Sequence, residues 1–301
     1  MSDPIQMRLP AVGLIGPGTL GRPIAARLMR GGRPLAVHAR RHEAALSLIE
    51  AGATWCATAR ELAAVSDIVF IVVSDTPDVE QVLFGPHGVI EGARPGALVI
   101  DLSTISPQAS REFARRLAER GVDMLDAPVS GGEASAIDGT LSVMVGGGDA
   151  ALARARPLLD VIGSTVVHVG EHGAGQVAKS CNQIITAVTI EAVAEALTLA
   201  RRLGADPGRV RAALGGGFAA SSALEQQGAR MIARDFSPGL RAAVQARDLG
   251  IVIDSAHALG LDLPASAIAA QQLNALVGAG EGDLDTSAMI KVLERMIGDY
   301  R

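Results

Sequence analysis

Aromatic residues are scarce in this chain of 301 residues, at 2% of the sequence. Because hydrophobic residues still make up 49%, the core must be built from Ala, Val, Ile and Leu, which suits parallel strands and closely packed helices. No polar, highly charged tract is present, which argues against disorder. The length suggests about two domains.

Cysteine, histidine and positive charge are also limited. The two cysteines, Cys56 and Cys181, have neither metal nor redox spacing, so we expect buried free thiols. The six histidines do not pair with acids or cysteines at metal spacing, and we predict no metal. The net charge of −5 argues against nucleic acid as a partner, because phosphate binding needs a basic face.

Signals for export and for membrane insertion are absent from the sequence. The first residues lack the basic and apolar regions of a signal peptide. No uncharged apolar run reaches the roughly 18 residues that a membrane helix needs. We therefore expect a cytoplasmic enzyme with a small-molecule substrate and no membrane partner.

The first half of the chain alternates short apolar runs with segments of helical periodicity. Strands that alternate with helices indicate a mostly parallel sheet, and uninterrupted apolar strands are typical of a sheet covered on both faces. We therefore predict an α/β, Rossmann-type domain over residues 1–170. Its expected strands lie at residues 11–15, 35–37, 68–73, 97–100, 124–125, 141–145 and 165–169.

The pattern changes near Gly170. Residues 174–203 favour one helix, which would span roughly 45 Å and connect two domains. We predict an all-α domain over residues 171–301 for substrate binding and oligomerisation, with at least a dimer because its helices offer more apolar surface than one small bundle covers. Further helices are expected at residues 207–214, 222–233, 240–259, 265–277 and 287–297.

A glycine-rich turn follows the first predicted strand and precedes a helix predicted at residues 19–29. Gly16 would allow the tight turn, Gly18 would let the backbone approach a pyrophosphate, and Gly21 would let the helix pack on the strand. The helix N-terminus offers N–H groups and a positive dipole end to an anion. A plain βα turn is the alternative. The predicted dinucleotide site comprises Gly16, Pro17, Gly18, Thr19, Leu20 and Gly21.

The end of the second predicted strand distinguishes the two nicotinamide cofactors. An NAD site would place an acid there to bind the ribose hydroxyls. This chain has no acid at that point but has Arg40 and Arg41, whose guanidinium groups suit a ribose 2′-phosphate. We predict NADP as the cofactor, with NAD possible, and solvated surface charges as the alternative role of the two arginines.

Three separated motifs give the chain a resemblance to the β-hydroxyacid dehydrogenases, the family of 3-hydroxyisobutyrate dehydrogenase. They are the glycine turn, the stretch Asp126-Ala127-Pro128-Val129-Ser130-Gly131-Gly132, and Gly173-Ala174-Gly175 with Lys179 and Asn182. The resemblance covers nearly the whole chain. It implies NAD(P)-dependent reduction of a small carboxylated aldehyde to a β-hydroxyacid by a homodimer or homotetramer.

Further motifs resemble one branch of that family, which reduces tartronate semialdehyde (2-hydroxy-3-oxopropionate) to glycerate. These motifs are Asp75-Thr76-Pro77, Gly216-Gly217-Phe218-Ala219 and Phe236-Ser237-Pro238-Gly239. The alternatives are a 3-hydroxyisobutyrate or 4-hydroxybutyrate dehydrogenase (a succinate semialdehyde reductase) and an imine reductase, although imine reductases commonly replace the lysine. A nucleotide-binding protein with a decayed site is the non-enzymatic alternative.

The resemblance gives Lys179 the central catalytic role. An ammonium beside the carbonyl oxygen would stabilise its negative charge and donate a proton during reduction. The alternative is a surface lysine. Asn182, three residues on and on nearly the same helix face, would orient the substrate through its amide. Gln183, four residues on, is the alternative for this role.

The remaining site residues would bind the substrate carboxylate and the cofactor. Ser130, Gly131 and Gly132 would offer a hydroxyl and close backbone N–H groups to the carboxylate, unless they form an ordinary turn. The further cofactor-binding residues are Val73, Ser74, Thr104 and Arg247.

Alternatives and departures accompany these assignments. Ser103 and Thr104 could cap a helix before Pro107, a role that is compatible with cofactor binding by Thr104. Many relatives have lysine where this chain has Arg247, and histidine where it has Gln245, which affects the expected geometry near the nicotinamide.

Overall fold

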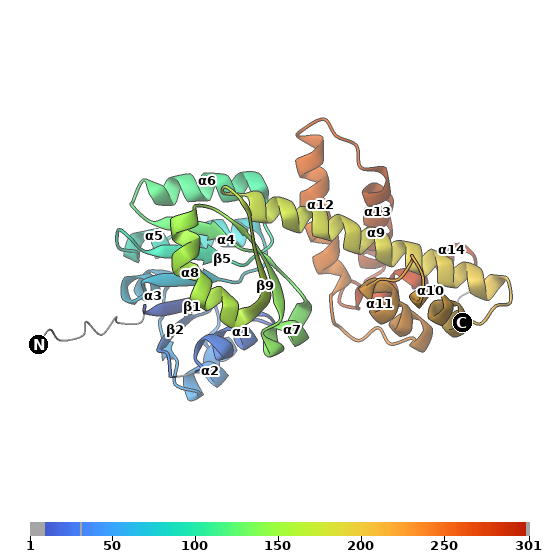
Figure 1. The fold of residues 1–301 in the computed structure, drawn as a ribbon, viewed down its shortest axis with the longest axis horizontal. Helices are drawn as coiled ribbons and strands as arrows, with labels where there is room; N and C mark the ends of the chain where they lie inside the picture. Colours follow the sequence, from blue (N-terminus) through green and yellow to red (C-terminus); the bar gives the residue numbers. More distant parts are fainter. Residues whose placement is uncertain (1–9, 31, 299–301) are drawn as a thin grey trace, which may run out of the picture. The chain divides into compact units, whose positions relative to one another are not determined.

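The computed structural model describes residues 10–30 and 32–298 (Figure 1). It contains two compact units, the first ending at Lys179 and the second beginning at Ser180. Among the described residues, the strands lie in the first unit and the second is helical. The predicted fold class is confirmed: a mostly parallel Rossmann sheet, a long helix and a helical C-terminal part. The domain limits of 1–170 and 171–301 stay a prediction.

The sheet of the first unit has the strand order β3-β2-β1-β4-β5-β6-β8-β7, with β9 paired to β8. The first six strands in this order are parallel, which is the Rossmann arrangement. Strand β8 runs antiparallel to β6 and β7. The strands are β1 Val12–Ile15, β2 Leu35–His38, β3 Thr54–Trp55, β4 Ile68–Ile71, β5 Leu98–Asp101, β6 Asp123–Asp126, β7 Val129–Ser130, β8 Leu141–Gly146 and β9 Gly163–Gly170.

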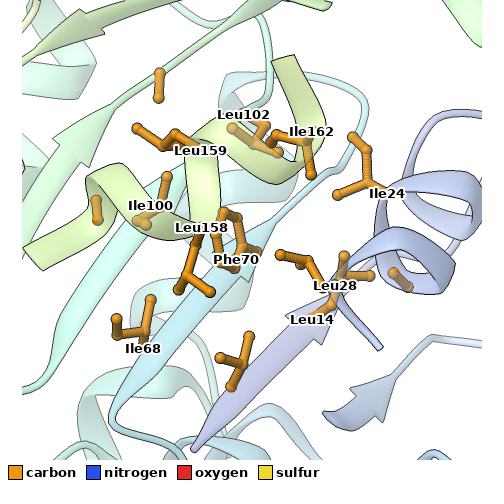
Figure 2. Close-up of a cluster of buried hydrophobic side chains, with 14 of the residues drawn as sticks. Leu14, Ile24, Leu28, Ile68, Phe70, Ile100, Leu102, Leu158, Leu159 and Ile162 are labelled. Carbon is orange, nitrogen blue, oxygen red and sulfur yellow. The ribbon is translucent and has the colours of Figure 1, made fainter. Parts of the chain in front are cut away.

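Helices cover both faces of this sheet because successive strand residues point to opposite sides. Leu14 belongs to a cluster with α1 and α8, which Figure 2 shows around Phe70 and Ile100. Its neighbour Ile15 packs in a second cluster with α3, α4 and α6. The helices of this unit are α1 Gly21–Leu28, α2 Leu46–Glu50, α3 Ala59–Val65, α4 Thr76–Phe84, α5 Val89–Gly92, α6 Pro107–Ala118, α7 Gly132–Asp138 and α8 Asp149–Ile162.

The second unit buries its own core between helices. Ile190 and Leu197 of the long helix pack with Met231, Leu249 and Leu273. Two of its helices begin with side-chain caps, as Asp206 accepts from Arg209 N and Ser221 from Leu224 N. The helices are α9 Ala174–Arg202, which begins in the first unit, α10 Pro207–Gly215, α11 Ser222–Ala233, α12 Ala242–His257, α13 Pro264–Gly278 and α14 Met289–Met296.

Helix α9 agrees closely with the predicted connector at residues 174–203. In the part of the chain that the structure describes, it is the one helix long and apolar enough to cross a membrane by length and composition. The apolar window is 44% buried, and the core helix of a soluble protein meets the same criteria. The expectation of no membrane partner stays a prediction.

Three local predictions are wrong. Cys181 is exposed rather than buried, although Cys56 is buried as expected. The cap of helix α6 is Ser106, whose hydroxyl accepts from Ala109 N, so neither Ser103 nor Thr104 caps it. Helix α1 begins two residues later than predicted, at Gly21, because the glycine turn extends through Leu20.

Glu191 on helix α9 makes the stability of the protein depend on pH. It is 5% exposed, and neither carboxylate oxygen has a hydrogen-bond partner. Burial, and then repulsion from Glu195, raises its pKa to about 7. Between pH 4.5 and 7 this carboxyl is therefore more protonated in the folded state than in the unfolded state, and its contribution to stability falls as pH rises.

We expect Glu191→Gln to stabilise the protein by roughly 1–3 kcal/mol at pH 8, because each unit of pKa shift corresponds to about 1.4 kcal/mol. The gain should shrink as pH falls toward 4.5. Urea unfolding across this pH range measures it, with the exposed Glu50→Gln as the control. An equal effect of Glu191→Gln at every pH would contradict this explanation.

Candidate active site

The parallel register brings the carboxyl ends of five strands into one row. Ile15 pairs with His38 on one side and with Ile71 on the other. The row continues from Ile71 to Asp101 and from Asp101 to Asp126. The predicted site residues of the first unit come shortly after these strand ends, at 16–21, 40–41, 73–74, 104 and 130–132. Lys179 lies elsewhere in the sequence but contacts Val129, beside the last of these segments. Ligands of open α/β sheets bind at this edge.

The glycine turn after Ile15 has distinct requirements at its three glycines. Gly16 has a φ of +91°, and a Cβ there would lie 2.2 Å from Val72 O. A Cβ on Gly21 would lie 2.1 Å from Gly16 O, so helix α1 can pack here only without a side chain. A Cβ on Gly18 would meet no atom within 4 Å. Unlike Gly16 and Gly21, Gly18 is therefore not required to avoid a clash within the chain, and its lack of a side chain leaves open space beside the turn.

The start of helix α1 fits a phosphate. Helices α3, α4 and α6 are capped by the side chains of Thr58, Asp75 and Ser106, whereas Leu20 gives α1 no side-chain cap. Gly18 and Thr19 are exposed beside this helix end. Arg22 N donates to Gly18 O and Pro23 has no N–H, so an anion here would be bound by the N–H groups that precede Arg22, and the helix dipole adds to the attraction.

The two arginines predicted to select the cofactor follow strand β2. Both are exposed, and the Arg40 side chain is 85% accessible. Its guanidinium Nη1 lies 3.4 Å from Asp78 Oδ1, a long contact that holds it weakly. The Arg40 guanidinium is therefore accessible to an anionic ligand at the edge of the sheet.

Ser103 connects the segment of Val73 to that of Thr104. The Ser103 hydroxyl accepts a hydrogen bond from Val73 N at 3.0 Å, and Ser103 N donates to Asp101 Oδ1 at 3.0 Å. Thr104 comes next and is partly exposed, as is Val73, while Ser74 is exposed. The structure thus brings the ends of strands β4 and β5 together at the predicted cofactor side.

Asp101 and Asp126 are fully buried neighbours in this row. Burial raises the pKa of Asp101 to about 7; the hydrogen bonds from Ser103 oppose this rise, and the charge of Asp126 adds to it. Burial also raises the pKa of Asp126, against the hydrogen bonds that it accepts from Gly173 and Gln176. Burial therefore disfavours the charged form of both carboxyl groups at this edge of the sheet.

Lys179 reaches the segment that follows Asp126. Its side chain lies on helix α9, the residue is 8% exposed, and Nζ donates to Val129 O at 2.8 Å. Ser130 is the next residue, and the chain then turns through Gly131 and Gly132, with φ values of +132° and +72°. The predicted lysine and the predicted carboxylate-binding turn thus lie together in the first unit.

The remaining predicted residues belong to the second unit. Asn182 lies three residues after Lys179 on helix α9 and is partly exposed. The Gln183 amide donates to Asp248 Oδ2 at 2.8 Å. Arg247 donates to Asp248 Oδ1 from Nε and Nη2, at 3.1 and 2.6 Å. Asn182 and Arg247 stay predicted site residues.

Two residues at this edge were not assigned a function from the sequence. Asp126 was recognised only as part of a motif, and Gln176, which is fully buried, was not singled out. A compositional signal for Lys179 was also available: of 27 Lys and Arg residues, only Lys179 and Lys291 are lysine. A lysine in an apolar helix of such an arginine-rich chain indicates a specific requirement.

The fold and this edge define a nicotinamide-dependent oxidoreductase, and the comparisons with known proteins agree. Residues 11–170 match the NAD-binding domain of 6-phosphogluconate dehydrogenase. Residues 173–293 match the family described as NAD-binding of NADP-dependent 3-hydroxyisobutyrate dehydrogenase. The chain belongs to the 3-hydroxyisobutyrate dehydrogenase-like family of NAD(P)-dependent β-hydroxyacid dehydrogenases, which act on CH–OH groups.

Individual relatives match over nearly their whole length. The chain is 47% identical to 2-hydroxy-3-oxopropionate reductase of Escherichia coli K12, over 95% of this chain and 97% of the relative. The structure of Mycobacterium tuberculosis 3-hydroxyisobutyrate dehydrogenase with L-serine has a TM-score of 0.88 and 33% identity, covering 95% and 99% of the two chains. Psf3 in complex with NADP+ has a TM-score of 0.85 and 27% identity, covering 94% and 100%.

The glycine geometry predicts opposite effects for two alanine variants. Gly16→Ala should lower stability by more than about 2 kcal/mol, because it adds both a clash and an unfavourable φ. Gly18→Ala should keep the wild-type Tm but raise the Kd for NADPH at least about tenfold, since its Cβ occupies the space left for a phosphate.

Thermal unfolding and NADPH fluorescence titration separate these effects. Gly278→Ala in helix α13, where a Cβ also meets no atom within 4 Å, is the control and should change neither quantity adversely. Wild-type NADPH affinity in Gly18→Ala would contradict the assigned role of this glycine.

Proposed function

We propose that the protein catalyses the NADPH-dependent reduction of tartronate semialdehyde (2-hydroxy-3-oxopropionate) to glycerate. One observation carries the mechanism: the buried Lys179 places Nζ 2.8 Å from Val129 O, directly beside Ser130 at the carboxyl edge of the sheet. The 47% identity to the reductase of this substrate from Escherichia coli supports the choice of aldehyde.

Lys179 supplies the proton in this mechanism. The nicotinamide cofactor, when bound, supplies the hydride to the aldehyde carbon. An ammonium donates hydrogen bonds, and the bond to Val129 O holds this one beside Ser130, at the turn assigned to the substrate. As negative charge develops on that oxygen, the ammonium stabilises it and transfers a proton. Burial strengthens this interaction because water does not screen it.

The substrate carboxylate is assigned to the turn after strand β7. Gly131 and Gly132 both have positive φ, so the backbone can turn its N–H groups toward an anion. A Cβ on Gly131 would lie 2.6 Å from the Ser135 Cβ, which supports a requirement for glycine. The Ser130 hydroxyl adds a donor beside Lys179.

Asn182 is assigned the neutral amide that orients the substrate oxygen. It follows Lys179 by three residues, so both share one helix face. The alternative, Gln183, is 3% exposed and donates to Asp248 Oδ2, which commits its amide to another partner. This contact favours Asn182 for the substrate role.

Oligomerisation and location complete the proposal. The second unit exposes large apolar side chains, including Ile185 and Leu199 on helix α9 and Leu203 just after it, which supports a homodimer or homotetramer. The net charge and the family are consistent with a cytoplasmic enzyme. Light scattering that gives a monomer would contradict the oligomer.

Related substrates provide the alternative functions. Members of the family include a 3-hydroxyisobutyrate dehydrogenase of Pseudomonas aeruginosa. A kinetic panel of tartronate, methylmalonate and succinate semialdehydes, with cyclic imines as a further class, distinguishes these candidates. The proposal requires the highest kcat/KM with tartronate semialdehyde and fails if another compound is preferred.

The cofactor preference predicts the effect of removing Arg40. A charge-assisted hydrogen bond to a ribose 2′-phosphate is worth about 1.5–3 kcal/mol, so Arg40→Ala should raise the KM for NADPH roughly 10- to 100-fold. The KM for NADH should stay within about threefold, because NADH lacks that phosphate. Steady-state kinetics with both cofactors measure this change. Arg60→Ala, which removes another exposed arginine, is the control.

The presence of only two lysines allows a matched test of the proton donor. Lys179→Met should lower kcat by about 10²–10⁴-fold, as expected for loss of a general acid, while NADPH affinity and Tm change little. Lys291→Met removes the other lysine, which pairs with Glu281, and should retain turnover. Near-normal kcat in Lys179→Met would refute the mechanism.

A further inference from the structure

The carboxylate of Asp126 holds the first turn of helix α9. Its Oδ1 accepts a hydrogen bond from Gly173 N at 2.7 Å, and its Oδ2 accepts one from Gln176 N at 3.0 Å. The residue is fully buried at the end of strand β6. A buried carboxylate that accepts two backbone N–H groups thus connects the sheet directly to the helix that carries Lys179.

Gln176 makes a second connection from the same helical turn. Its Nε2 donates to Ser103 O at 2.8 Å, and its Oε1 accepts from Ile105 N at 3.1 Å. These two residues flank Thr104, which is assigned to the cofactor. Ser103 is in turn bonded to Val73 N. One fully buried amide therefore joins the helix to the ends of strands β5 and β4.

Close packing leaves little freedom at this junction. A Cβ on Gly175 would lie 2.3 Å from Met144 O and 2.6 Å from Asp126 O. A Cβ on Gly146 would lie 2.7 Å from both carboxylate oxygens of Asp126. The helix therefore starts in direct contact with strands β6 and β8, and only glycine permits this approach.

Lys179 follows these contacts by about one to two turns of the helix. Gln176 is three residues before it and Gly175 four, so both are its neighbours along one side of the helix. Lys179 Nζ contacts Val129 O, three residues after Asp126 in the chain. Asp126 thus bonds the backbone of the helical turn before Lys179, and Val129, three residues further along the same segment, accepts from the lysine ammonium.

We propose that Asp126 and Gln176 are positioning residues, which hold the Lys179 ammonium and the Thr104 segment in one rigid arrangement for proton and hydride transfer. This inference rests on the proposed catalytic role of Lys179. A displacement of about 1 Å in a reacting group can lower the rate about 100-fold, so loss of either anchor reduces kcat.

The test uses Asp126→Asn and Gln176→Met in the full-length protein. In Asp126→Asn, one carboxylate oxygen becomes an NH₂ group, which cannot accept from the N–H donors of helix α9. Gln176→Met removes the hydrogen bonds to Ser103 O and Ile105 N at similar volume. Asp285→Asn is the matched control. Asp285 is also fully buried and accepts from Leu240 N and Ser287 N, each at 3.0 Å, but lies in the second unit.

We expect kcat to fall at least about tenfold in both variants, with the Kd for NADPH within about threefold of wild type. In protein labelled with ¹³C at lysine Cε, two signals arise, from Lys179 and Lys291. Both variants should shift or broaden the Lys179 signal and leave that of Lys291 unchanged. The control should retain kcat and the wild-type Lys179 signal.

A folded Gln176→Met protein with wild-type kcat and an unchanged Lys179 signal would overturn the proposal, even if Asp126→Asn does not fold. Equal loss of kcat in Asp285→Asn would also overturn it, since the effect would then reflect general destabilisation. Failure of the proposed function is distinguished by Lys179→Met: turnover in that variant rejects the lysine mechanism, whereas the NMR signals report positioning independently of activity.

Discussion

Parallel pairing in register is the constraint on which the rest of this structure depends. It ends strands β2, β1, β4, β5 and β6 in one row, from His38 to Asp126. Segments more than 80 residues apart in sequence therefore meet at one edge of the sheet. Because both faces are covered by helices, the strand interiors are apolar, and polar chemistry is concentrated at the strand ends, where Asp101 and Asp126 lie, and in the residues just beyond them.

Helix α9 extends this arrangement by carrying Lys179 to the same edge. Most of its first turn is committed to the sheet, through the carboxylate of Asp126 and the amide of Gln176. The buried acid lies at the positive end of the helix dipole, which offsets part of its desolvation. Burying charged groups lowers stability, so their presence at this junction is better explained by a requirement for position than by a contribution to stability.

The sequence predicted the larger features well, because they depend on periodicity and turn chemistry. The apolar runs located most strands, and the connector was placed within one residue at Arg202. The two-residue strands β3 and β7 were missed, since such short strands have no periodicity of their own. Asp126 and Gln176 could not be assigned because their partners lie 47 to 73 residues away in sequence. Cys181 was predicted to be buried because cysteines usually are. Its exposure depends on which face of the helix packs inward, which the sequence did not reveal.

The most direct test of this account is a crystal structure with the oxidised cofactor and glycerate bound. The account predicts that Lys179 Nζ lies within hydrogen-bond distance of the hydroxyl oxygen on the carbon that exchanges hydride, with the glycerate carboxylate on the turn at Ser130. It also predicts that Asp126 still bonds the start of helix α9. A substrate hydroxyl bound away from Lys179 Nζ would contradict the central claim.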